Sequence, residues 1–356
     1  MWSRRIVLIA LAIALVAPLF IAGIPPLLDY PVTGHLLPQT LAEKALIALA
    51  LLLPVLGTVA LHDAIFARRS WWPLASALIA YNAALIAGDL ELLIGAGLAL
   101  FGAACWVRLR QNAWQQWLTY AAIAVPYCFI HFAGTGFSFA MIAAFELSEA
   151  WRERQAARLA MRAVKLGLAA LPVAALYFQT QLAGGADPLP LHAVKTVWWA
   201  INKLDPFAKA IGAGAEFFTY DSGIDLLIMI AVAAALGFLA LARKLAFSWL
   251  TLLGVALYLV YPFLPLPDAA PGAIDIRLPV LAGFLLFGGI MPRKLGRRET
   301  AVLGLAFAAL IAARLGVIAN AWQGQNGDLA ANDFVVAAAQ APDRPPVLLN
   351  PGPSAP

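Results

Sequence analysis

The amino-acid sequence predicts an all-α, polytopic integral membrane protein, a bundle of about eleven transmembrane helices. The chain of 356 residues is 63% hydrophobic and only 12% charged, and no water-soluble domain of this size hides so much apolar surface. Long apolar stretches recur from end to end, which excludes a soluble domain with a single anchor. The stretches are continuous, rich in Ala and Leu, and lack two-residue alternation, so helices are expected rather than a β-barrel.

Each expected transmembrane helix is close to the ~20 residues that cross a bilayer. The helices are expected at residues 6–23, 43–65, 72–88, 90–108, 114–130, 132–150, 160–182, 224–242, 246–264, 277–292 and 299–322. The first run also fits a signal peptide, but the poor cleavage pattern at Ala17-Pro18 favours an uncleaved anchor. Cys105 and Cys128 both fall within apolar runs, so we interpret them as core residues rather than as a disulfide or a metal pair.

The basic residues predict the orientation. If the N-terminus is cytoplasmic, most of the 24 basic residues fall in alternate, inner loops, as the positive-inside rule requires. This places the C-terminus outside and predicts a multi-pass membrane protein. The net charge of +5 is spread through short loops, so membrane lipids are the expected partners and nucleic acid is not.

Unusual chemistry is expected mainly on the outer side. Residues 1–322 form the predicted transmembrane domain, which includes an outer segment at 183–223, and residues 323–356 are predicted to be a disordered extracytoplasmic tail. Within the outer segment, Trp198 and Trp199 lie between Lys195 and Lys203 in an expected short interfacial helix. That helix either fixes the tilt of the bundle or clamps a lipid-linked substrate, with Lys195 or Lys203 on a phosphate.

Five stretches of the sequence carry a family resemblance. They are PPLLDYP (25–31), ALLLPVLGTVALHDAIFARRSWWPLASALIAYN (50–82), GDLELLIGAGLALFGAACWVRLR (88–110), FIHFAGTGFSFAMIAAFELSEAW (129–151) and AIDIRLPVLAGFLL (273–286). These spaced patches, which continue to about residue 320, resemble a family of large bacterial membrane proteins related to the GT-C glycosyltransferases, in which an Asp-Tyr-Pro-Asn-His motif opens the first outer loop.

The resemblance implies a transferase that takes a sugar from a polyprenyl-phosphate donor to a lipid or glycan acceptor on the outer face. It places the catalytic base at Asp29, which would take a proton from the acceptor hydroxyl. Asp275 and Arg277 lie on the same face and would bind or orient substrate. Cationic groups or a divalent cation would hold the leaving phosphate, and Arg314, a lone cation deep in the last span, could meet a lipid phosphate.

The sequence also departs from that family. Val32-Thr33 stands where the motif has Asn-His, and the first outer loop is only about 19 residues long, where family members carry helices that cover the site. A shortened relative with another role, a decayed enzyme and a defective gene model all fit this departure. Whether the chain is an enzyme is therefore left open, and the alternative is a non-enzymatic multi-pass protein, either a transporter or an assembly partner.

Each candidate residue also has a structural interpretation. Asp29, Asp275 and Arg277 fit loop or helix caps, and Arg314 fits a side chain that reaches toward the outer interface. Asp89 would sit at a tight helical hairpin, and His131 would be a satisfied polar group at a turn; both are also candidate substrate-binding residues. No zinc-ligand spacing, Walker loop or nucleophile elbow is present in the sequence, and no metal ligands are predicted.

Overall fold

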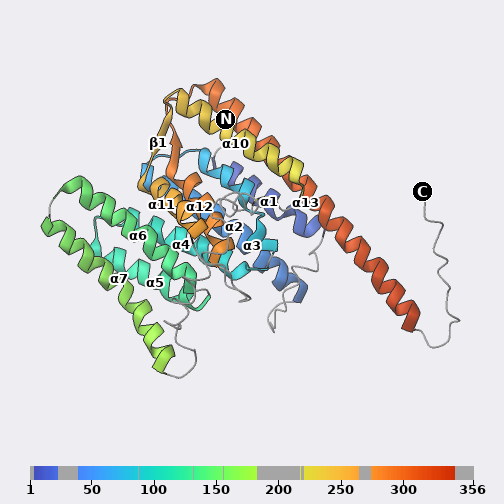
Figure 1. Ribbon diagram of the computed structural model, residues 1–356, viewed down its shortest axis with the longest axis horizontal. Helices are drawn as coiled ribbons and strands as arrows, with labels where there is room; N and C mark the ends of the chain where they lie inside the picture. The colour runs from blue at the N-terminus through green and yellow to red at the C-terminus, as the bar shows by residue number, and fades with distance from the viewer. Residues whose placement is uncertain are drawn as a thin grey trace.

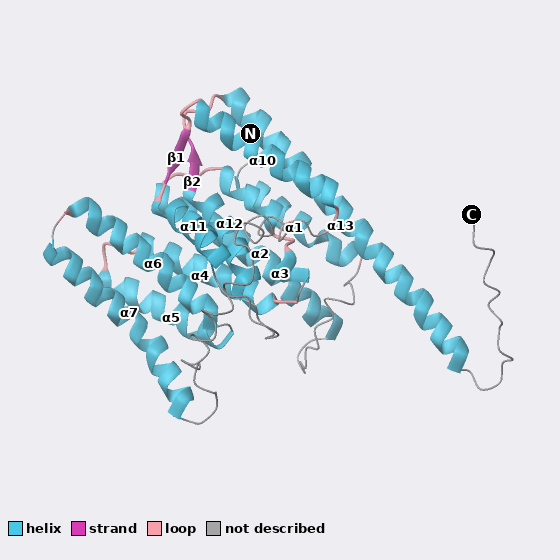
Figure 2. Ribbon diagram, viewed as in Figure 1, coloured by secondary structure: helices cyan, strands magenta, loops and turns pink. Residues whose placement is uncertain are grey.

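The chain folds almost entirely into helices, with one short pair of strands (Figures 1 and 2). This computed structural model describes residues 4–22, 39–86, 88–130, 132–154, 156–182, 217, 220–263 and 274–340. The elements in chain order are α1 (Arg4–Ile21), α2 (Gln39–Phe66), the 3₁₀ helix η2 (Trp72–Ile79), α3 (Ala83–Ile86), α4 (Leu90–Arg108), α5 (Ala113–Ile130), α6 (Phe132–Glu153), α7 (Ala156–Leu182), α10 (Ser222–Leu241), β1 (Leu245–Phe247), α11 (Trp249–Val260), the 3₁₀ helix η4 (Tyr261–Phe263), α12 (Ile274–Gly289), β2 (Ile290–Pro292) and α13 (Arg297–Gln340).

Five helices of the described chain are long and apolar enough to cross a membrane. They are α1, α4 and α10 over their full lengths, α2 from Leu41 to Phe66, and α13 from Arg297 to Gly324. The apolar stretches Trp249–Phe263 and Leu278–Gly289 are shorter. The helical membrane architecture expected from the sequence is thus supported, whereas the expected number of about eleven spans is not confirmed.

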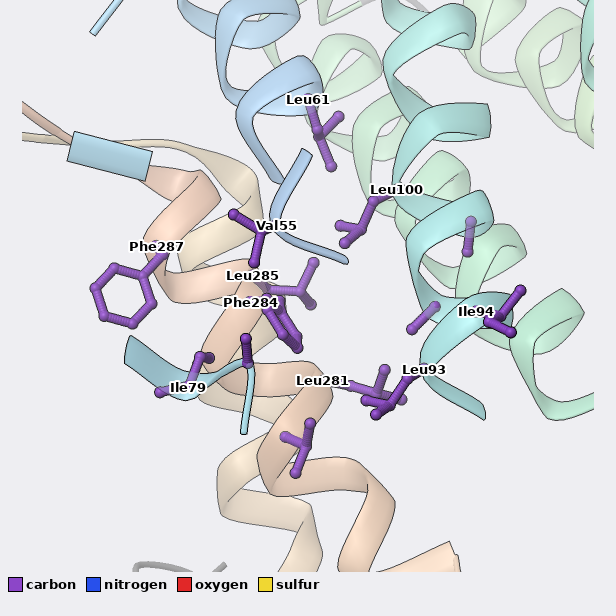
Figure 3. Packing of buried hydrophobic residues seen from close by; sticks show 14 of the residues in the cluster. Val55, Leu61, Ile79, Leu93, Ile94, Leu100, Leu281, Phe284, Leu285 and Phe287 are labelled. Atoms are coloured by element: carbon purple, nitrogen blue, oxygen red, sulfur yellow. The ribbon is translucent and has the colours of Figure 1, made fainter. Parts of the chain in front are cut away.

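The centre of the bundle is the crossing of α2 and α4. Of the membrane-length stretch of α4, 78% is buried, against 17% in α1, α10 and α13. Figure 3 shows Val55 and Leu61 of α2, Leu93 and Leu100 of α4 and the α12 residues Phe284 and Leu285 in one apolar cluster. A Cβ atom on Gly97 would lie 2.5 Å from the carbonyl carbon of Leu53, so only glycine allows the two backbones to come this close.

The predicted span at 72–88 is wrong as a continuous helix. The chain there forms η2, breaks, and forms the single turn α3. Asn82 stabilises the break: its amide donates to Ile79 O (2.9 Å) and Ala80 O (3.2 Å), and its Oδ1 accepts from Leu85 N (3.2 Å). Every residue from 72 to 82 is buried, and such irregular backbone is tolerated at membrane depth only inside protein.

The η2–α3 segment connects opposite ends of the bundle. Gly97 contacts Leu53, and Arg108 Nη2 donates to Ala60 O at 3.2 Å, so α2 and α4 run parallel. The chain between two parallel helices has to return along the bundle. A 3₁₀ helix rises about 2.0 Å per residue, against 1.5 Å in an α-helix, so this short segment covers much of the distance.

Charges divide between the two ends of the bundle. One end, which we call the basic end, is held together by the Arg4–Asp63 pair, by His62 Nδ1 with Gly288 O (3.0 Å), and by Lys244–Glu299 (2.5 Å). It also carries the exposed cations Arg68, Arg69, Arg108, Arg110, Arg152, Arg154, Arg243, Arg293, Lys294, Arg297 and Arg298. The opposite end, the acidic end, carries Glu43, Asp89, Glu91, Asp221 and Asp225 at or near the N-termini of α2, α4 and α10.

Strands β1 and β2 close the basic end beside α11 and α12. They pair antiparallel, with Ala246 opposite Met291. Next to this strand pair, α11 packs closely against α12: a Cβ atom on Gly289 would lie 2.5 Å from Thr251 N. The predicted spans at 246–264 and 277–292 therefore each combine one strand with one short helix.

Helix α13 is longer than predicted. It continues from Arg297 to Gln340, so residues 323–340, which were expected in a disordered tail, are helical. At ~1.5 Å per residue its length is about 66 Å, roughly twice the ~30 Å hydrocarbon core of a bilayer. Figure 1 shows its C-terminal part standing clear of the other helices. Residues 341–356 lie outside the described chain.

Candidate functional site

Arg314 lies in a buried polar cluster near the acidic end, formed by α13, α10 and the η2–α3 break. Its side chain is 4% exposed, and Nη1 lies 3.2 Å from Oδ1 of Asp225, which is 3% exposed. Nη2 donates to two backbone oxygens, Tyr81 O at 2.9 Å and Phe217 O at 3.0 Å. The guanidinium therefore binds one carboxylate and two carbonyl oxygens of non-helical backbone.

Aromatic side chains enclose this ion pair. Tyr81 donates its hydroxyl to Leu15 O at 2.6 Å, and Trp322 Nε1 donates to the Tyr220 hydroxyl at 3.2 Å. The rings of Tyr81 and Trp322 meet edge to face, with centroids 5.7 Å apart. Burial raises the pKa of Tyr220 to about 12, so this phenol stays neutral in the physiological range. We call Arg314, Asp225, Tyr81, Tyr220 and Trp322 the Arg314 cluster.

Local sequence fixes Asp225 in its place. Asp221 caps α10 by accepting from Ile224 N at 2.9 Å, so Asp225 falls in the first turn of the helix. A carboxylate in a first turn is stabilised by the helix dipole. The apolar residues of α10 from Leu226 onward continue into the bilayer. Asp225 is therefore the carboxylate of α10 that pairs with Arg314.

The structure gives Arg314 a structural task that the sequence did not predict. Its two terminal nitrogens bond to Asp225 and to backbone, instead of reaching along the helix toward the interface. The role of Arg314 as a ligand of a lipid phosphate stays a prediction, and such a ligand would have to compete with these partners. The sequence analysis did not identify Asp225. The feature that could have indicated it is an acidic residue at the edge of a strongly apolar run.

The structure describes only some of the remaining predicted site residues. Asp89 directly precedes α4 at the acidic end and is partly buried. The backbones of Asp275 and Arg277 lie in the first turn of α12, which runs toward the basic end; their side chains are outside what the structure describes. Asp29, His131, Lys195 and Lys203 lie outside the described residues.

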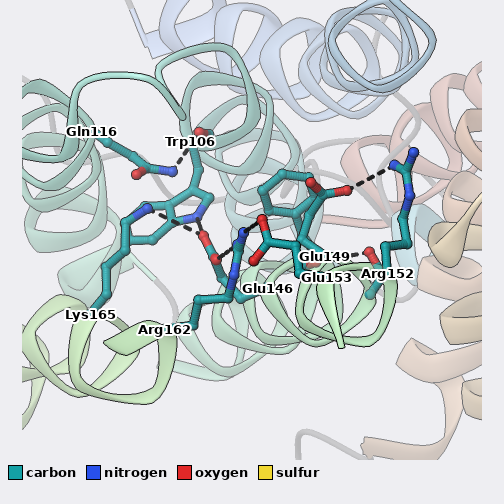
Figure 4. Close-up of polar contacts among 10 residues, drawn as sticks. Trp106, Gln116, Glu146, Glu149, Arg152, Glu153, Arg162 and Lys165 are labelled. Atoms are coloured by element: carbon teal, nitrogen blue, oxygen red, sulfur yellow. Dashed lines mark hydrogen bonds and ion pairs between the residues drawn. The ribbon is translucent and has the colours of Figure 1, made fainter. Parts of the chain in front are cut away.

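A second buried cluster joins three helices near the basic end (Figure 4). Glu146 of α6 is 1% exposed and accepts from Trp106 Nε1 of α4 at 2.8 Å. It also pairs with Arg162 of α7, and with Lys165 of α7 at 3.4 Å. Arg162 reaches Glu153 at 2.9 Å, so two carboxylates and two cations balance one another. Glu149 and Arg152, also on α6, lie outside this cluster and pair with each other at 3.0 Å.

The described residues hold no group of three or more His, Cys, Asp or Glu side chains placed to bind a metal ion. Both buried clusters in the described part are compensated ion pairs.

Comparison of the chain with protein-family models, with curated proteins and with solved structures found no match.

Proposed function

We propose that the protein is a multi-pass transferase of the bacterial plasma membrane that moves a sugar from a polyprenyl-phosphate donor to a lipid or glycan acceptor. The reaction is assigned to the acidic end, which faces outward if the basic end is cytoplasmic. The single observation that supports this location is the division of charge: the exposed arginines of the described chain lie at the basic end, whereas the acidic end carries five carboxylates and the buried Arg314.

Chain connectivity adds to this proposal. Helix α1 ends at Ile21 and α2 begins at Gln39, both at the end opposite the Arg4–Asp63 pair. The Asp-Tyr-Pro motif at residues 29–31 stands between these two helices in the sequence, which supports a site at the acidic end. Asp29 would act there as the general base toward the acceptor hydroxyl, and Arg277 would offset the charge of the departing phosphate.

A non-enzymatic role, as an assembly partner or transporter, is the second candidate. It is favoured by the contacts of Arg314, since the buried cation that was expected to meet a lipid phosphate already bonds to Asp225, Tyr81 and Phe217. An enzyme needs charged groups that can bind the substrate. In a protein with a purely structural role, each buried charge can stay paired with a charge of opposite sign.

Sugar transfer in nanodiscs separates the two candidates. Purified protein is incubated with radiolabelled polyprenyl-phosphate sugars and total membrane lipid and glycan, with wild type beside Asp29→Asn and Asp221→Asn as a matched control. Transfer that is lost in Asp29→Asn and retained in Asp221→Asn supports the enzyme. Absence of transfer with every donor, from protein shown to be folded, favours the non-enzymatic role.

A further inference from the structure

The outer surface of α5 and α7 has the side-chain distribution of a surface that faces lipid. On α7, Arg162 and Lys165 turn inward to Glu146. Large apolar side chains of the same helix are exposed instead, at Met161, Val164, Leu168 and Leu171. A helix that turns its cations inward and exposes a row of large apolar side chains fits surroundings of hydrocarbon. The helix thus continues the lipid-facing surface of the bundle.

The α4–α5 turn lies at the basic end of this surface and is tightly ordered. Leu109 N donates to Cys105 O and Asn112 N to Leu109 O, both at 2.9 Å, and Asn112 Oδ1 caps α5 by accepting from Gln115 N at 3.2 Å. These bonds fix the positions from which Arg108 and Arg110 project into solvent.

Two indoles follow the turn along α5. Trp114 is 67% exposed and stacks on Trp117, with ring centroids 5.5 Å apart and 21° between planes. Trp117 Nε1 donates to Leu168 O of α7 at 2.9 Å, which ties the stacked pair to the apolar face of α7. Exposed indoles at the end of a membrane helix sit at headgroup depth, and Leu118, one turn deeper, is exposed as well.

Neither arginine of the turn has a carboxylate partner among the described residues. The sequence contains no Asp or Glu between Glu91 and Glu146. The carboxylates that the structure describes at the basic end, namely Asp63, Glu146, Glu149, Glu153 and Glu299, are each paired with other cations. Arg108 makes one hydrogen bond, to the neutral Ala60 O at 3.2 Å. The two charges are therefore available to an anion from outside the protein.

We propose that Arg108, Arg110 and the Trp114–Trp117 stack form a binding site for an anionic phospholipid of the leaflet at the basic end. The order of groups along the bundle matches the order within such a lipid. The arginines meet the phosphate and the anionic headgroup, the indoles lie at the glycerol level, and Leu118 with the apolar face of α7 contacts the acyl chains. This site is independent of any sugar transfer at the acidic end.

Native mass spectrometry of delipidated full-length protein tests this site, with phosphatidylglycerol titrated against phosphatidylcholine of the same acyl chains. The test variant is Arg108→Gln/Arg110→Gln. The control is Arg297→Gln/Arg298→Gln, which removes the same charge from the same end at the exposed start of α13, away from any tryptophan of the turn.

We expect wild type and the control to bind phosphatidylglycerol in preference to phosphatidylcholine. The test variant should lose about 25-fold in affinity for phosphatidylglycerol, about 5-fold for each cation near a lipid headgroup, and bind phosphatidylcholine as wild type does. Equal losses in both double variants would mean that net charge alone acts, and an unchanged test variant would mean that no site exists; either result overturns the proposal. Unfolding curves that coincide with wild type exclude misfolding as the cause.

Discussion

Arg314 on α13 and Asp225 on α10 form an ion pair across 3.2 Å with both side chains almost wholly buried. The guanidinium also bonds to the carbonyls of Tyr81 and Phe217, so one cation holds two helices, the η2–α3 break and the turn before α10. The irregular backbone of this region is stable at membrane depth because a charged side chain supplies the donors that helices would otherwise supply.

The first prediction concerns that pair. Arg314→Met leaves Asp225 buried without its cation, and Asp225→Asn leaves Arg314 without its carboxylate, so each should cost about 3–5 kcal/mol of unfolding free energy. The double variant Arg314→Met/Asp225→Leu should cost clearly less than the sum of the two single changes. Unfolding by SDS in mixed micelles measures all three. Additive losses would show that the two charges do not depend on each other.

The second prediction compares two glutamates on α6. Glu146→Gln leaves Arg162 and Lys165 partly buried without their shared anion and should cost about 3 kcal/mol. Glu149→Gln removes a mostly exposed i, i+3 pair with Arg152 and should change stability by less than about 0.5 kcal/mol. The same SDS unfolding assay applies. Similar losses in the two variants would mean that Glu146 is not the centre of the cluster in Figure 4.

The third prediction tests the α2–α4 crossing. Gly97→Ala adds a Cβ atom 2.5 Å from the carbonyl carbon of Leu53, so the helices must separate, and a loss of about 2 kcal/mol or more is expected. Gly304→Ala, on α13, meets nothing within 4 Å and should be neutral or stabilising by up to about 1 kcal/mol, as in other helix interiors. Thermal unfolding in detergent compares the two. A stable Gly97→Ala protein would contradict the close approach of the backbones.

The fourth prediction concerns orientation in the membrane. In a chain with Cys105 and Cys128 replaced by Ala, Arg110→Cys should react with an impermeant maleimide only after the cytoplasmic side is opened. Asp221→Cys should react in intact spheroplasts, because the acidic end faces outward in the proposed orientation. The reverse pattern would place the proposed sugar transfer on the wrong side of the membrane, and labelling of both from one side would refute the division of the bundle into two ends.

The sequence predicts well those features that depend on neighbouring residues. The expected span at 90–108 coincides with α4, because a continuous apolar run with Asp89 before it and Arg108 at its end marks both boundaries. The expected helix at 72–88 fails because composition does not distinguish a lipid-exposed helix from a buried 3₁₀ segment. The helix is interrupted at Asn82, whose side chain hydrogen-bonds to the nearby backbone and thereby competes with a continuous helix.

Contacts between distant residues could not be predicted. Arg314 was recognised as an intramembrane cation, but its partner Asp225 is 89 positions away in the chain, and no local pattern joins them. Arg162 and Lys165 lie near the start of the expected span at 160–182, and no neighbouring residue indicates that both contact Glu146 on α6. Pairing of buried charges is thus expected in general, while the identity of the partner comes only from the fold.

Helix α13 is about twice as long as a bilayer core is thick. Its apolar stretch, Arg297–Gly324, is also longer than one span needs, so hydrophobic length alone fixes its height in the membrane only loosely. Two attachments to the α10 region prevent this. Glu299 binds Lys244 at the basic end, and Arg314 binds Asp225 about 22 Å further along the axis, at ~1.5 Å per residue. Because the two residues are separated by close to four whole turns, both face the same neighbour. The height and the rotation of α13 are therefore set together by electrostatic contacts, and the point at which its C-terminal arm leaves the membrane is defined by the protein rather than by the thickness of the lipid.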